Sequence, residues 1–170
     1  MSFINTYQEQ VIVYGSALQA SDYAQYYDTT TQINAGGTGQ AITFNTVELQ
    51  NGISLVNNKE ITVSKTGKYA VSFSIQYKNV SSQEQYVDVF FWKNGTVLPD
   101  SNSEFGIVRR QSGVDGKVIA SSTIFFNLNA NDYLELYWHS TSTDITVEYI
   151  TAKPYVPATP SIFFNIQLIS

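Results

Sequence analysis

The chain has 170 residues, a formal net charge of −5 and no cysteine. A chain of this length can bury roughly 70% of its unfolded surface in one core, so we expect a single domain. Without cysteine the protein has no disulfide, no catalytic thiolate and no thiolate metal site, and without a run of Lys and Arg it lacks the basic stripe that nucleic-acid binding requires.

Short alternating segments follow one another along the chain, separated by turn residues, and no segment keeps a 3.6-residue period. We place an N-terminal extension at 1–22, with a predicted strand at 10–14, and the folded domain at 23–170. Its predicted strands are 23–31, 41–49, 52–56, 60–64, 68–78, 85–93, 96–98, 117–128, 132–139, 144–151 and 161–169. About ten strands at this spacing predict an all-β fold of two antiparallel sheets, a sandwich or jelly roll.

Charged residues make up only 14% of the chain, against about 25% in a typical soluble domain. A surface so poor in charge is typical of a protein that is partly covered in an obligate oligomer. The N-terminus has no basic segment followed by a long apolar run, and nowhere do about 18 apolar residues follow one another. We therefore expect a protein made in a cytoplasm without a signal peptide and without membrane insertion.

The predicted strand 68–78 has two faces of different kinds. One set of alternating residues, beginning with Tyr69, is large and apolar and belongs in a core. The other set is small or neutral, where a face turned to water usually carries Lys, Glu or Thr: Ala70, Ser72, Ser74 and Gln76. The strands 117–128 and 161–169 are two-sided in the same way, which indicates that these strands are covered on both faces.

Three motifs occur in a fixed order along the domain. They are Thr66-Gly67-x-Tyr69 at the start of a strand, Asn94-Gly95 in a hairpin, and Leu128 followed by Asn131-Asp132 after a strand. In this order they resemble the tumour-necrosis-factor and complement-globular-head superfamily of trimeric jelly rolls, over about residues 23–170. The closing strand departs from the family's Phe-x-Gly-x-Leu-Leu pattern, so the ligand and receptor roles of animal members are not carried over.

The resemblance implies a homotrimer in which one sheet packs against two neighbouring subunits. Together with the two-sided strands it predicts a trimer axis lined by Ala70, Ser72, Ser74, Gln76, Ser121, Thr123, Phe125, Phe163, Asn165 and Gln167. A monomer in which long loops cover the same strands is the alternative interpretation.

The chain offers little for catalysis. Its only histidine, His139, is expected on the face of its strand opposite the core. The segment holding Asp100, Asn102 and Glu104 is compatible with a Ca²⁺ loop and with a plain polar turn. A catalytic pair of carboxylates that are distant in the sequence and close in the fold stays possible. No Ser-His-Asp arrangement and no phosphate-binding glycine loop occurs in the sequence. We therefore expect that the protein is not an enzyme and that it binds no metal and no cofactor.

Aromatic residues near the Asn-Gly hairpin are candidates for stacking against a sugar, because aromatic rings combine an apolar face with a polar edge. The candidates are Tyr86, Phe90 and Trp92, with Tyr23, Tyr26 and Tyr27 upstream. In the alternative interpretation Trp92 caps the core and the tyrosines pack between subunits.

Bacteriophage structural proteins of the same superfamily provide the expected function. The short chain, without a fibre shaft before the domain, favours a capsid decoration or head-fibre protein on the virion surface, and a tail-fibre tip that binds host glycans is the alternative. The partners would then be its own copies and the capsid or tail proteins. The extension is expected to be a docking arm, with apolar contacts from Phe3, Ile4, Tyr7, Val11, Ile12, Val13 and Tyr14.

Overall fold

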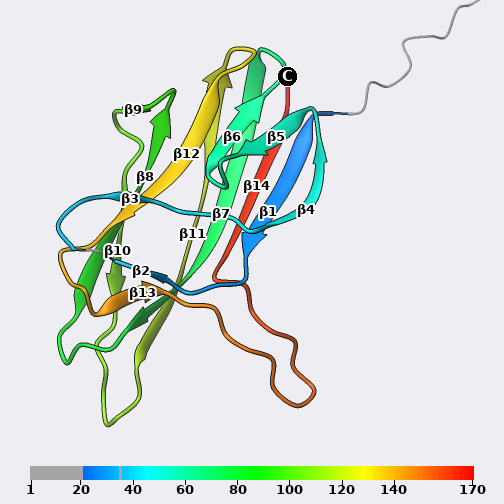
Figure 1. Cartoon of the computed structure of the whole chain (residues 1–170). Coiled ribbons are helices and arrows are strands. Elements are labelled where there is room, and N and C mark those ends of the chain that lie inside the picture. Colours follow the sequence, from blue (N-terminus) through cyan, green and yellow to red (C-terminus); the bar gives the residue numbers. More distant parts are fainter. Residues whose placement is uncertain (1–20, 35) are drawn as a thin grey trace, which may run out of the picture.

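The computed structural model describes residues 21–34 and 36–170, and these residues form strands and no helix (Figure 1). Ten of the strands have four residues or more, which confirms the predicted all-β fold of about ten strands. The strands are β1 (Tyr23–Asp28), β2 (Gln32–Ile33), β3 (Gln40–Ala41), β4 (Thr46–Asn51), β5 (Ile53–Val56), β6 (Glu60–Val63), β7 (Gly67–Asn79), β8 (Gln85–Lys93), β9 (Thr96–Val97), β10 (Ser103–Ile107), β11 (Gly116–Leu128), β12 (Tyr133–His139), β13 (Ile145–Val147) and β14 (Ile162–Leu168).

Two antiparallel sheets make up the domain. In sheet A, β7 lies at the centre with β11 on one side and with β14 and β13 on the other; β14 continues to β1 and β4, and β13 to β2. In sheet B the order is β10-β8-β12-β6-β5, with β3 added to β12 and β9 to β8. We call the side of each sheet that points away from the other sheet its outer face.

The core lies between the two sheets and is built by strict alternation. Along β7 every second residue from Tyr69 to Asn79 is buried, and the residues between them are half-buried. The ring of Phe91 on β8 lies 4.9 Å from that of Phe126 on β11 and 6.3 Å from that of Phe73 on β7, measured between ring centroids. Because these ring contacts join the two sheets, the core fixes which face of each strand points outward.

Some predicted strands differ from the observed ones. The predicted strand 41–49 is broken, because Ile42 and Phe44 point into the core from a crossing segment between β3 and β4. The predicted strand 144–151 ends at Val147, and β10 was not predicted at all. The predicted strand 10–14 lies outside the described residues.

Both ends of the described chain lie at the same end of the sandwich (Figure 1). Asp22 is buried there, and its carboxylate accepts hydrogen bonds from Lys65 Nζ at 2.7 Å and Ser64 Oγ at 3.0 Å. The backbone N–H of Lys68 donates to the carbonyl of the C-terminal Ser170. The opposite end of the sandwich carries the longer loops, including residues 108–116 and 150–160.

Candidate functional site

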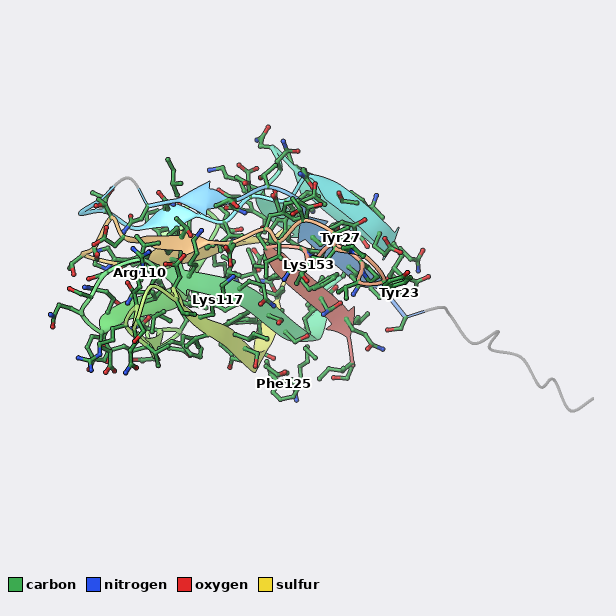
Figure 2. The ribbon with its side chains drawn as sticks, turned by 90° about the horizontal axis from the view of Figure 1, so that it is seen from below. Tyr23, Tyr27, Arg110, Lys117, Phe125 and Lys153 are labelled. Atoms are coloured by element: carbon green, nitrogen blue, oxygen red, sulfur yellow. The ribbon has the colours of Figure 1, made fainter. Side chains whose placement is uncertain are left out.

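The outer face of sheet A is a flat surface built from four neighbouring strands, β11, β7, β14 and β1. Strand register places their outward side chains in three straight rows. The rows are Ser121–Ser74–Phe163–Tyr27, Thr123–Ser72–Asn165–Gln25 and Phe125–Ala70–Gln167–Tyr23. In Figure 2, Phe125 and β11 lie on one side of β14, and Tyr23 and Tyr27 lie on the other side.

None of the side chains in the three rows is charged. The exposed Glu48 on β4 lines a hollow of this face beside Gln25 and Tyr27. On the central strands, charged side chains lie only beyond the ends of the rows. At one end Lys78 and Lys117 both pair with Glu148, and at the other end Lys68 lies opposite Asn127. Burial raises the pKa of Glu148, but the hydrogen bonds from Lys117 and Lys78 outweigh it and hold the pKa below its ordinary value. The carboxylate is therefore ionised, and the two ammonium groups balance its charge.

Large apolar side chains are exposed on the same face. Phe125 is 66% exposed, Ile119 beside Gln76 is 61% exposed, and Leu49 beside Gln25 is 45% exposed. Single exposed apolar residues are ordinary, but several on one face make it a candidate interaction surface.

All ten residues predicted for the trimer axis lie on this face. Gln76 stands one row beyond the three rows, beside Ile119. Within the face the Phe163 ring lies 5.6 Å from the Tyr27 ring, and the Asn165 amide donates to Ser72 Oγ at 3.4 Å. The predicted set does not include five further residues that β1, β4 and β11 add to the face: Tyr23, Gln25, Tyr27, Leu49 and Ile119. The alternative interpretation of the tyrosines places Tyr23 and Tyr27 between subunits.

Three shallow hollows mark the face. One of about 370 Å³ lies over Ala70, Ser72 and Asn165, with Tyr23 and Leu49 at its rim. A second, of about 410 Å³, lies between Tyr27, Phe163 and Pro160. A third, of about 300 Å³, lies over Gln76 and Ile119, with Ile150 at its rim. The relief is shallow and mostly apolar, which suits contact with another protein surface rather than a small molecule.

The predicted sugar-stacking residues Phe90 and Trp92 lie on the outer face of sheet B. Trp92 stacks on Tyr137 with 4.6 Å between ring centroids and 16° between ring planes, and Phe90 lies 5.8 Å from the same ring. Trp92 therefore does not cap the core, and one of its faces is covered. Tyr86 lies at the far end of β8, so the three residues do not form one platform.

The upstream tyrosines are divided between two sides of the sheet. Tyr26 is completely buried in the core, and its hydroxyl donates to Gln50 Oε1 at 3.3 Å. It is therefore unable to stack on a sugar, and the interpretation that includes it is wrong. Tyr23 and Tyr27 point to the outer face of sheet A.

His139 and the segment from Asp100 to Glu104 come together beside Asp88. His139 Nδ1 lies 3.4 Å from Asp88 Oδ2 on the outer face of sheet B. The Asn102 amide donates to Asp88 Oδ1 at 2.8 Å, and Glu104 lies in β10 opposite Asp88. Among residues 21–34 and 36–170, no group of three or more His, Asp or Glu side chains is placed to hold a metal ion. Asp100 lies in a turn, and β10 begins at Ser103.

The described part of the chain has no helix of the length and apolarity needed to cross a bilayer. The predicted docking-arm residues, Phe3 to Tyr14, lie outside the described residues. No protein-family model and no curated protein sequence matches the chain.

Proposed function

We propose that this chain is a non-enzymatic structural protein of a virus particle, assembled as a homotrimer through the outer face of sheet A. Its place on the particle is that of a capsid decoration or head-fibre protein. The observation that carries the proposal is the outer face itself, where three registered rows of uncharged side chains stand beside exposed Phe125, Ile119 and Leu49. Burial of the apolar side chains of this face stabilises an oligomer, and the three rows themselves bring no charge into the contact.

The pairing of the longer strands supports a jelly roll. Eight of these strands, taken in chain order, are β1, β6, β7, β8, β10, β11, β12 and β14. The first pairs with the last, the second with the seventh, the third with the sixth and the fourth with the fifth. A long antiparallel hairpin rolled into two sheets produces this pairing, and such double-sheet rolls are common in capsid proteins.

We propose threefold assembly because the sequence resembles a superfamily of trimers. In a ring of three, each subunit contributes one flat face and one edge, and the contacts close without leaving an open end. A threefold protein also matches a threefold site on a capsid, where it stabilises the shell by contacting several capsid subunits at once.

The place where the chain enters the domain supports attachment by the N-terminal extension. The start of β1 lies beside Gln167 and Asn51, at one end of the outer face of sheet A. In a trimer built on this face, three extensions would leave the assembly at the same end. We propose that this end faces the particle and that the end with the longer loops faces outward.

Electron cryo-microscopy of the purified particle tests the proposal. We expect threefold knobs on the shell whose density fits three copies of the sandwich, with sheet A at the axis. Density at a tail or fibre end would instead assign the chain to the receptor-binding class. A variant lacking residues 1–20 should stay a soluble trimer and no longer attach to particles, and its continued attachment would contradict the role of the extension.

A further inference from the structure

The loop between β13 and β14 forms a braced projection, which we call the finger (residues 150–160). Figure 1 shows it as the orange loop that extends beyond the sheets at the end opposite the termini. Two backbone bridges hold its sides together, Ile150 with Thr159 and Lys153 with Val156, each through a pair of hydrogen bonds of 2.8 to 3.0 Å. Its three prolines fix φ at further positions, so the finger is ordered before it meets any partner.

Tyr155 occupies the tip of the finger in an unusual backbone conformation. The turn runs from Lys153 through Pro154 and Tyr155 to Val156, whose N–H donates to the Lys153 carbonyl at 3.0 Å. Tyr155 has a φ of 66°, at a turn position where glycine is the ordinary residue. Its side chain is 105% exposed, and Val156 beside it is 55% exposed. A strained backbone thus holds a whole aromatic ring in water, the arrangement of a binding anchor.

A hollow on the outer face of sheet A has the character of a site for this ring. It is the hollow of about 300 Å³ over Gln76 and Ile119, with the Lys117–Glu148 ion pair on its rim. Ile119 is 61% exposed there and gives the hollow an apolar wall, and the Lys117–Glu148 ion pair on the rim supplies polar groups that a phenol hydroxyl can hydrogen-bond. The chain's own Tyr155 leaves the hollow empty, because its side chain is fully exposed.

We propose that Tyr155 of each subunit inserts into the Gln76–Ile119 hollow of the neighbouring subunit. This inference rests on the trimer proposed above. Tyr155 and the hollow are different surfaces of one chain, so three such contacts close a ring. Each subunit then inserts its Tyr155 into one neighbour and receives the Tyr155 of the other. The hollow adjoins the three uncharged rows, because Gln76 and Ile119 form the next row along the strands. We call the insertion of Tyr155 into the neighbour's hollow the clasp, and it would extend the same interface towards its outward end.

Cysteine pairs test the clasp directly, because the natural chain contains no cysteine. We expect the double variant Tyr155→Cys, Ile119→Cys to form covalent trimers under mild oxidation on a denaturing gel. Mixing the two single variants should yield a covalent dimer that neither variant forms when oxidised alone, which shows that the bond joins position 155 of one chain to position 119 of another. The control pair Tyr155→Cys, Val97→Cys places the second thiol on exposed β9 of sheet B and should give no trimer.

A second variant separates the ring from the backbone. Tyr155→Gly removes the ring and relieves the positive φ, so it leaves the protomer's own stability unharmed. We expect it to raise the concentration at which the trimer dissociates at least tenfold in sedimentation equilibrium. A wild-type trimer with no cross-link, and with no change in Tyr155→Gly, would overturn the clasp and leave the trimer in place. A monomeric wild-type protein would overturn both.

Discussion

A single charge on the outer face of sheet A should dissociate the trimer without unfolding the protomer. Ser72 lies in the middle row on the central strand, between Thr123 and Asn165 and beneath a surface hollow of about 370 Å³. In a lone protomer the substitution Ser72→Lys has room for the longer side chain, and its ammonium group reaches water. In the trimer the same group would be buried in a row that contains no carboxylate.

The magnitude follows from the threefold symmetry. Burial of an unpaired ion has an effective penalty of several kcal/mol, and the trimer contains the substitution three times. At about 3 kcal/mol per ion the total is about 9 kcal/mol, which lowers the equilibrium constant for assembling three chains by roughly six orders of magnitude. Because three chains combine into one trimer, the concentration at which half of the protein is dissociated rises by the square root of this factor, about a thousandfold. A trimer that is half dissociated in the micromolar range would therefore become monomeric throughout that range.

Sedimentation equilibrium, with circular dichroism to confirm the fold, measures this effect. Two controls separate charge from other causes. Ser72→Gln adds bulk without charge and should weaken the trimer far less, and Thr62→Lys places the same charge on β6 of sheet B and should leave it intact. A Ser72→Lys protein that stays trimeric at the wild-type concentration would refute the assignment of this face.

Three further predictions concern the protomer. Phe91 is completely buried, so Phe91→Ala should lower the unfolding free energy by about 3 to 5 kcal/mol in chemical denaturation, whereas Tyr86→Ala on the surface should change it by less than about 0.5 kcal/mol. Burial raises the pKa of Asp132, but hydrogen bonds, led by that from Lys93, outweigh it and hold the pKa below its ordinary value of 3.8. The folded state is therefore stabilised above that value, and this stabilisation is lost as the pH falls through the folded pKa. We expect Asp132→Asn to make the unfolding free energy depend less on pH on the acid side. Burial raises the pKa of Tyr26 to about 12, so stability should fall between pH 10 and 12, where the unfolded chain ionises first, and this fall should be smaller in Tyr26→Phe.

The sequence is sufficient for the long strands because alternation is strong where one face enters the core. The predicted strand 85–93 matches β8 residue for residue, and β7 extends the predicted strand 68–78 by one residue at each end. The apolar set of the predicted strand 68–78, which begins with Tyr69, is buried throughout, as predicted. A period of two is enough here because a slip by one residue would expose the whole apolar set.

The sequence is insufficient where tertiary contacts decide the conformation. The segment Ser103–Ile107 contains Glu, Gly and Ser and has a weak strand pattern, yet it becomes β10 because the edge of β8 supplies hydrogen-bond partners. The opposite case is the segment with Ile42 and Phe44, which alternates like a strand but crosses between the sheets.

The candidate site was predicted in part. Its ten residues could be assigned to one face because each strand alternates, but the three rows depend on the register between four strands, which no single strand encodes. The alternation of Tyr23, Gln25 and Tyr27 with Ala24 and Tyr26 is visible in the sequence and would have added β1 to the face. No pattern in the sequence predicts the finger, because only the folded structure shows that Tyr155 projects from a braced turn.

The mass of the wild-type protein in solution tests the central claim most directly. Light scattering or sedimentation equilibrium of the full chain at micromolar concentration should give three times the 19.0 kDa mass of one chain. A mass of 19.0 kDa at that concentration would show that the uncharged outer face of sheet A is exposed in a monomer and would contradict the account.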